Sequence, residues 1–297
     1  MATAKIAPQK STTVRSNGRR SLQRLTLHVL EALIPSIVER WAALQFLTPR
    51  RIRPEDLALP LDEAFDLRSG TYHLRAWSWG VGPVVLLVHG WEGHAGQLRG
   101  FVEPLVNQGF RVVAVDLPAH GFSSGRRTTV LDFADALCAV EDVVGPVHAV
   151  IAHSFGGAAT ALALHPGRRT DQRLLAQRVV LLAPPEGPAH FVQGVTGLLG
   201  LSPKRSEGIA RHVQALVGID FAAVTIPRFA HQLRVPLLLM HDPADRVVPW
   251  AHAQAIATAW PGARLLPTPR LGHHRILTDP QVIAEAVSFI ADPSVAR

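Results

Sequence analysis

The sequence predicts an α/β fold in which a mostly parallel central sheet carries helices on both faces and a small helical lid is inserted between two strands. Short apolar runs alternate with stretches of helical spacing from about residue 62 to residue 290, which is the pattern of strand–helix–strand units. Runs such as Val84–Val88 are apolar at every position, as strands buried on both faces are.

The composition is that of a globular protein with one large core. The chain has 297 residues, of which 47% are hydrophobic and 18% charged, and a chain of this length can bury a large α/β domain. Its single cysteine, Cys138, cannot form an internal disulfide, and no spaced set of Cys and His residues indicates a zinc site. We therefore expect neither a metal nor a cofactor.

The positive charge lies near the N-terminus. Residues 1–53 hold ten Lys or Arg against two Glu, a net charge of +8, whereas the remaining chain holds 20 basic and 21 acidic residues. A nucleic-acid-binding domain usually carries its own basic face, so this distribution argues against a nucleic-acid partner. We expect residues 1–20, which are rich in Ser, Thr, Lys and Arg and contain no acid, to form a disordered basic tail.

Residues 21–54 are predicted to form an amphipathic helix followed by a linker. Apolar residues recur at helical spacing, Pro35 is expected to divide the helix, and the charges of Glu31, Glu39 and Arg40 exclude a transmembrane span. Two interpretations remain open: the helix packs on the catalytic body, or residues 1–47 lie on an anionic membrane surface. The protein is accordingly expected in the cytoplasm, free or peripheral to the inner face of a membrane.

The elements from residue 62 onward are expected in a regular order. Two strands joined by a turn at Ser69-Gly70 come first, and alternating strands and helices follow. The strands are expected at Ala64–Arg68, Tyr72–Trp79, Val84–Val88, Val112–Val115, Val147–Ala152, Val179–Leu182, Leu237–Met240 and Arg264–Pro267. The helices are expected near Gly96–Asn107, Val130–Val143, Trp250–Ala259 and Pro280–Ile290, with another that opens at Phe155.

One segment interrupts this alternation. Residues 187–232 separate two strands that otherwise need only one helix between them, and they are rich in Gly, His and Phe. Ser206–Val217 has helical spacing within this segment. We expect the insertion to form a lid over the functional site.

A serine stands where an apolar strand runs into a helix. The sequence there is Ala152-His153-Ser154-Phe155-Gly156-Gly157. A nucleophilic serine on a strained strand-to-helix turn needs small neighbours, and the residues at 152, 156 and 157 are small. The usual pattern is Gly-x-Ser-x-Gly, so Ala152 is a departure that keeps the position small.

An earlier turn supplies the expected oxyanion donors. His89-Gly90-Trp91 follows the strand Val84–Val88, and we assign the donors to the backbone N–H groups of Trp91 and Phe155. His89 itself is expected to be a buried structural residue. His94 and His153 are expected to line the substrate pocket.

Two later segments supply candidates for the acid and the base. Asp242 and Asp245 both follow the strand Leu237–Met240, and His273 and His274 both follow the last expected strand. A serine nucleophile needs one histidine as base and one carboxylate to orient that histidine. The residue types and their order along the chain leave both pairs open.

The order of these motifs resembles the α/β-hydrolase family, in its serine-nucleophile, esterase- and lipase-like branch. The resemblance covers roughly residues 70–291 and includes the stretch Asp116-Leu117-Pro118-Ala119-His120-Gly121, which in that family is a structural loop. It implies that residues 55–297 are the catalytic domain and that the triad is Ser154, Asp245 (before Arg-Val-Val-Pro) and His273 (directly after Gly272).

These parts together predict a serine hydrolase that cleaves a carboxylic ester of a small acyl substrate through an acyl-enzyme. Family members that dehalogenate haloalkanes or open epoxides need Asp at the elbow, so Ser154 excludes those activities. A thioesterase, an acyltransferase, a membrane-associated lipid hydrolase and a non-catalytic binding module remain as alternatives.

Overall fold

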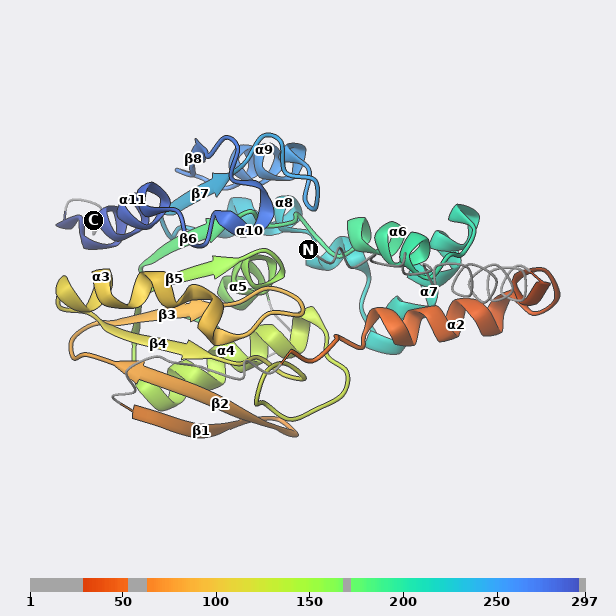
Figure 1. Cartoon of the computed structure of the whole chain (residues 1–297), viewed down its shortest axis with the longest axis horizontal. Helices are drawn as coiled ribbons and strands as arrows, with labels where there is room; N and C mark the ends of the chain where they lie inside the picture. The colour runs from red at the N-terminus through yellow and green to blue at the C-terminus, as the bar shows by residue number, and fades with distance from the viewer. Residues whose placement is uncertain (1–28, 53–62, 168–171, 294–297) are drawn as a thin grey trace, which may run out of the picture.

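The computed structural model describes residues 29–52, 63–167 and 172–293. The expected basic tail at 1–20, the start of the N-terminal helix and the end of its linker lie outside these ranges. The described chain forms a sheet with helices on both faces and a group of helices that projects to one side of it (Figure 1).

An eight-stranded sheet has the strand order β1-β2-β4-β3-β5-β6-β7-β8. Only β2 runs against its neighbours, and the pairs from β4 through β8 are parallel. Every expected strand is present, and its ends differ from the prediction by at most one residue. The strands are β1 (Glu63–Ser69), β2 (Tyr72–Trp79), β3 (Val84–Val88), β4 (Arg111–Val115), β5 (Val147–His153), β6 (Arg178–Leu182), β7 (Leu237–His241) and β8 (Arg264–Pro267).

Two hydrophobic layers cover the sheet, one on each face. Alternate residues of a strand point to opposite faces: Leu86 packs with helices α4 and α5, whereas Leu87 packs with α3 and α11. Because both layers are apolar, the central strands are apolar at every position, as the sequence predicts. The helices are α3 (Val102–Asn107), α4 (Val130–Val144), α5 (Phe155–Leu164), α9 (Trp250–Ala259), α10 (Gly272–Arg275) and α11 (Pro280–Ala291).

The helix expected near Gly96–Asn107 is only half α-helical. Residues Ala95–Phe101 form a 3₁₀ helix, η1, and α3 continues from Val102. Gly96 and Gly100 lie in the first half, and glycine disfavours an α-helix by about 1 kcal/mol relative to alanine. Gly100 is also crowded, since a Cβ there would lie 3.1 Å from Ile283 Cδ1.

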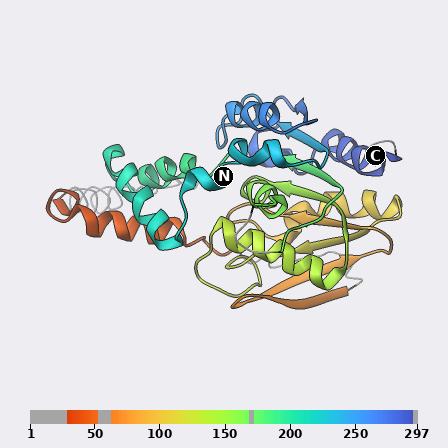
Figure 2. The ribbon, with the colours of Figure 1, turned by 180° about the vertical axis from the view of Figure 1, so that it is seen from behind.

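The helices that project from the body form what we call the cap, which consists of α2 (Pro35–Phe46), α6 (Ala189–Leu198) and α7 (Ser206–Val217). The helical segment before α2 breaks at Ile34, directly before Pro35, as the sequence predicts. Buried side chains of all three helices, and of residues shortly after α2 and α6, share one cluster: Val38, Ala42, Ala43, Leu47, Val192, Leu201, Ile209 and Val213. The N-terminal helix and the insertion between β6 and β7 therefore form one packed unit (Figures 1 and 2).

The rest of the insertion packs on the body. In α8 (Ile226–Phe229), Ile226 and Phe229 are buried in the layer that contains α5 and α9. Phe221 still packs against the cap cluster, whereas Val224 is buried in the layer of the body, so the chain passes from the cap to the body between these two residues. Within the described ranges, no helix combines the length and the apolar character that crossing a bilayer requires.

Candidate active site

Ser154 lies on a strained turn between β5 and α5. Its φ of 51° and ψ of −125° are unusual for a residue with a side chain. Its N–H donates to the Leu182 carbonyl of β6 at 2.8 Å, which fixes the turn to the neighbouring strand. A Cβ at Gly156 would lie 2.3 Å from the His89 carbonyl oxygen, and one at Gly90 would lie 2.9 Å from Ser154 Cβ. The turn is therefore closed to larger residues at both glycines.

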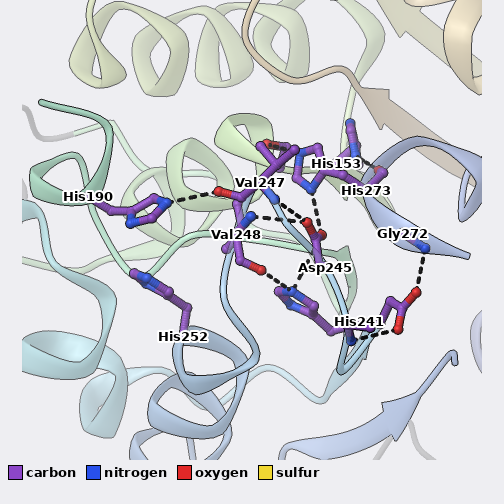
Figure 3. Close-up of polar contacts among 12 residues, drawn as sticks. His153, His190, His241, Asp245, Val247, Val248, His252, Gly272 and His273 are labelled. Atoms are coloured by element: carbon purple, nitrogen blue, oxygen red, sulfur yellow. Dashed lines mark hydrogen bonds and ion pairs between the residues drawn. The ribbon is translucent and has the colours of Figure 1, made fainter. Parts of the chain in front are cut away.

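The structure brings Ser154, His273 and Asp245 together from three separate segments. The Ser154 hydroxyl lies 2.9 Å from His273 Nε2, and His273 Nδ1 lies 2.8 Å from Asp245 Oδ2. All three residues are at least nine-tenths buried. Figure 3 shows Asp245 between His273 and His241, on the loop that follows β7. This is the geometry of a nucleophile, a base and an orienting acid.

Backbone amides hold the carboxylate of Asp245 on its other side. Asp245 Oδ1 accepts from the N–H groups of Val247 at 2.7 Å and Val248 at 3.1 Å. Burial alone would raise the pKa of Asp245, but the hydrogen bonds from His273 and from these amides outweigh burial and hold that pKa below its ordinary value. Asp245 is therefore ionised and oriented toward the imidazole at neutral pH.

The two alternative residues from the sequence, Asp242 and His274, lie in different surroundings from Asp245 and His273. Asp242 accepts from the N–H of Ala244 at 2.8 Å and from the N–H of Gly272, so it links the acid loop to the start of α10. His274 is exposed and faces the cavity described below, whereas His273 is buried. The hydrogen bonds that begin at the Ser154 hydroxyl thus include His273 and Asp245 rather than His274 and Asp242.

The amides of Trp91 and Phe155 lie at the edge of the turn. Phe155 is the first residue of α5, so its N–H has no partner within that helix. Within the described ranges neither of the two amides donates to a protein acceptor. The rings of Trp91 and Phe155 pack edge to face with centroids 5.2 Å apart, which ties the two segments together. Both amides are therefore available to an oxyanion.

Two buried histidines hold the turn that carries Trp91. His89 Nδ1 donates to the Gly90 carbonyl at 2.7 Å, and its Nε2 accepts from the Leu117 N–H at 3.0 Å. His120 Nδ1 donates to the Pro118 carbonyl at 2.9 Å, and its Nε2 accepts from the Glu92 N–H at 2.9 Å. Each ring acts once as donor and once as acceptor, which only a neutral imidazole can do.

Burial explains why these rings are neutral. It lowers the pKa of His89 to about 4 and the pKa of His120 to about 3.

Asp116, in the same group of loops, accepts from the N–H groups of Ala95 at 2.7 Å and Phe122 at 2.8 Å. His89, Asp116 and His120 thus have structural roles, as the family resemblance implies.

A cavity of about 440 Å³ opens beside Ser154. Its lining is mostly apolar, with Trp91, Phe155, Phe191, Val195, Val213, Val217, Ile219, Phe221 and Val224 among the residues. His153 also lines it, as expected, and His153 Nε2 donates to the His273 carbonyl at 2.9 Å. Burial, followed by the nearby His273, lowers the pKa of His153 to about 3. His153 therefore braces His273 as a neutral ring.

His94 is not among the residues that line this cavity. It directly precedes η1, and it interacts electrostatically with Asp116 of the structural loop. The prediction of His94 as a pocket residue came from its closeness in sequence to Trp91. Glu92 and Gln97, on either side of His94 in the sequence, do line the cavity, so closeness in sequence does not decide which side chains face it.

The N-terminal segment contributes to the site, and no motif in its sequence indicates this contribution. Phe46, Leu47, Arg50 and Ile52 line the cavity. The Arg50 guanidinium lies 2.6 Å from Glu92 Oε2, and the Arg50 N–H donates to Glu92 Oε1 at 3.0 Å. Glu92 directly follows Trp91, so the segment after α2 is fastened to the expected oxyanion turn. Arg50 lies in a basic run whose sequence predicts only a linker.

Comparison with known proteins places the chain among hydrolases. A family pattern described as "Alpha/beta hydrolase family" matches residues 85–286. A pimeloyl-[acyl-carrier protein] methyl ester esterase of Nitrosomonas europaea is 29% identical over 68% of this chain and 93% of its own length. A monoacylglycerol lipase of Mycolicibacterium smegmatis is 24% identical over 70% of this chain and 87% of its own length.

Solved structures share the fold at lower sequence identity. An esterase of Pyrococcus furiosus superposes with a TM-score of 0.62 at 19% identity and covers 82% of this chain and 98% of its own. A bromoperoxidase of Bacillus anthracis superposes with a TM-score of 0.58 at 18% identity and covers 77% of this chain and 99% of its own.

Replacing Gly156 by alanine tests the close packing behind Ser154. The new Cβ would lie 2.3 Å from the His89 carbonyl oxygen, so we expect Gly156→Ala to lower the free energy of unfolding by about 3 kcal/mol. Gly197→Ala in α6 is the matched control, because no atom lies within 4 Å of its Cβ position, and we expect it to stabilise by about 1 kcal/mol or less. Urea denaturation measures both. Equal stabilities of the two variants would contradict this packing argument.

The buried neutral histidines predict a loss of stability in acid. In the unfolded chain a histidine takes up a proton near pH 6.5, whereas the pKa values of His89, His120 and His153 in the folded chain are about 4, 3 and 3. Their contribution to stability is complete above pH 6.5 and falls as pH decreases toward 4, by about 1.4 kcal/mol per pH unit for each ring. Denaturation at pH 7, 6 and 5 measures the slope, which His120→Gln is expected to reduce. A slope unchanged by that variant would argue against a neutral buried His120.

Proposed function

This chain belongs to the alpha/beta hydrolase family, and we propose that it is a serine hydrolase that cleaves carboxylic esters with Ser154 as nucleophile, His273 as base and Asp245 as orienting acid. The observation that carries the proposal is the continuous hydrogen-bonded series from the Ser154 hydroxyl through His273 to Asp245, with contacts of 2.9 and 2.8 Å. Ser154 and His273 line a mostly apolar cavity of about 440 Å³, a size that suits a small organic ligand.

The first half of the reaction forms an acyl-enzyme. His273 Nε2 takes the proton of the Ser154 hydroxyl as the oxygen attacks the ester carbonyl carbon. Asp245 keeps the proton of His273 on Nδ1 and stabilises the imidazolium that forms. The amides of Trp91 and Phe155 donate to the oxyanion of the tetrahedral intermediate. His273 then gives its proton to the leaving alkoxide, which departs as an alcohol.

The second half regenerates the enzyme. His273 takes a proton from a water molecule, whose oxygen attacks the acyl carbon. The same two amides donate to the second oxyanion, and His273 returns the proton to Ser154 as the carboxylic acid leaves. Asp245, held by the Val247 and Val248 amides, is not protonated at any step.

The cavity supports an ester with an apolar acyl group as substrate. Aromatic and aliphatic side chains from α2, α6 and α7 surround the space beyond Ser154, and the Arg50–Glu92 pair is the charged part of its lining. The relatives named for a pimeloyl methyl ester and for monoacylglycerol also act on esters of acyl chains. We propose a monoester whose acyl chain lies against the cap.

Replacing Ser154 tests the nucleophile. We expect Ser154→Ala to lower kcat/KM for p-nitrophenyl acyl esters by about 10⁴-fold or more, and to abolish labelling by a fluorophosphonate probe. Ser288→Ala, on the exposed surface of α11, is the matched control and should keep both. A panel of acyl esters, thioesters and alcohol acceptors then separates an esterase from a thioesterase or an acyltransferase. Full turnover by Ser154→Ala would refute the proposed mechanism.

Paired replacements distinguish the two aspartates. Asp245→Asn no longer fixes the tautomer of His273, so we expect kcat to fall by about 10³- to 10⁴-fold with little change in unfolding temperature. Asp242→Asn weakens the link from the acid loop to Gly272, so we expect a lower unfolding temperature and a kcat within about tenfold of the wild-type value. Ester turnover and thermal unfolding of both variants measure these effects. The reverse order of kcat losses would assign the acid to Asp242.

A further inference from the structure

The N-terminal helix of the cap carries an apolar stripe on its outer side. Ile37 and Trp41 are four residues apart on one face of α2, and Leu33 precedes them on the other side of the break at Ile34. The exposed fractions of Leu33, Ile37 and Trp41 are 73%, 64% and 41%. Leu30 and Ile34 extend the stripe and are also exposed. We propose that this face, which we call the outer stripe, docks the enzyme on an anionic lipid bilayer.

The opposite face of the same helix is already occupied. Val38, Ala42 and Ala43 are buried in the cap cluster against α6 and α7. The outer stripe is therefore not the side that holds the helix to the protein. Six large apolar side chains between residues 29 and 41 are exposed in all, which exceeds what scattered surface hydrophobics explain and marks a contact surface.

The charges of this helix favour an anionic partner. Both of its carboxylates turn inward, and Glu39 lies 3.3 Å from Arg205 Nη1 while Glu31 lies 3.9 Å from Arg205 Nε. Glu31 and Glu39 are buried. Arg40, in contrast, is exposed beside the stripe. The outward side of the described segment thus carries apolar side chains, one arginine and no acid, which suits a helix that lies in the interface of an anionic membrane.

The sequence before the stripe reinforces this preference. Residues 1–28 hold six Lys or Arg and no Asp or Glu. A basic segment beside an apolar helical face is attracted to anionic lipid by about 1 kcal/mol per cation. A second copy of this chain would bring a second segment of the same charge to the contact, so charge repulsion opposes self-association through the stripe.

The cap links the outer stripe to the cavity. Phe46 and Leu47, at the end of α2, line the space beside Ser154, and α2 has 12 residues, which at 1.5 Å per residue span about 18 Å. Leu198 of α6 also lines the cavity and is 82% exposed. The helix that carries the outer stripe therefore also supplies part of the cavity wall.

Vesicle binding tests the proposal without any hydrolysis. The full chain carrying Ser154→Ala is sedimented with vesicles of phosphatidylcholine alone or with about one third phosphatidylglycerol. The test variant adds Ile37→Glu and Trp41→Glu to the outer stripe, neither of which lines the cavity. The control variant instead adds Val143→Glu, an exposed apolar residue of α4. When Ser154 is retained, both the outer-stripe variant and the Val143→Glu variant should keep the wild-type turnover of a short ester and the wild-type unfolding temperature.

We expect binding to the anionic vesicles that is at least about tenfold tighter than binding to the neutral ones and that weakens as salt is raised. The outer-stripe variant should bind the anionic vesicles at least about tenfold more weakly than Val143→Glu. Absence of vesicle binding by the full chain, or equal binding by both variants, overturns the proposal. It is also overturned if the wild-type chain is a dimer that the outer-stripe variant converts to a monomer, since the stripe is then a protein interface. Because vesicle binding and oligomeric state do not require turnover, failure of the esterase proposal leaves this one intact.

Discussion

The position of Ser154 depends on one strained backbone conformation, a φ of 51° at the end of a buried strand. Such a conformation persists only where the surroundings determine it. Here the Ser154 N–H is bound to β6, and Gly90 and Gly156 allow the turn before Trp91 to approach within the space that a Cβ would fill. The same approach places the Trp91 and Phe155 amides beside the serine, so the strain at one residue also assembles the expected oxyanion site.

Polar groups around the turn are held by backbone amides and carbonyls more than by other charges. His89, Asp116 and His120 bind backbone groups of the loops after β3 and β4, and His153 binds the carbonyl of His273. Neutral imidazoles suit this role because each supplies one donor and one acceptor while avoiding the cost of a buried charge. Asp245 can then be an ionised carboxylate next to His273, since two amides and the imidazole satisfy its oxygens. His241 lies on its other side, with Nε2 bound to the Val248 carbonyl at 2.8 Å, so the acid loop is fixed from both ends.

The sheet was predictable because its apolar runs report burial on two faces, a local property of the sequence. A meeting of a serine, a carboxylate and a histidine was also predictable, because each follows a strand and the carboxyl ends of parallel strands meet at one edge of a sheet. The choice of Asp245 over Asp242 and of His273 over His274 rested on the resemblance to the α/β-hydrolase family. The contribution of Phe46, Leu47 and Arg50 to the cavity was not, because it arises from contacts with residues far along the chain, such as Glu92. The prediction that His94 lines the pocket was wrong for a related reason. Its short sequence distance from Trp91 does not determine where its side chain points. The half-α, half-3₁₀ segment at 95–107 depends on packing at Gly100 that no periodicity reveals.

The cap is built from two segments that are distant in sequence, and this has a consequence for access to the cavity. Arg205 of the insertion joins both carboxylates of the N-terminal helix segment, while Arg50 joins that segment to Glu92 beside Trp91. Moving α6 and α7 away from the body therefore requires either that α2 moves with them or that the buried Glu31 and Glu39 lose their partner, which is costly for buried charges. The first alternative keeps those buried ion pairs and breaks the contacts of the segment after α2 with the body. These contacts are the Arg50–Glu92 pair and the hydrogen bonds from the Thr128 N–H to the Leu47 carbonyl and from the Arg51 guanidinium to the Gly125 carbonyl. A surface that binds the outer stripe of α2 would thus act on the whole cap at once, and through it on the walls of the cavity beside Ser154.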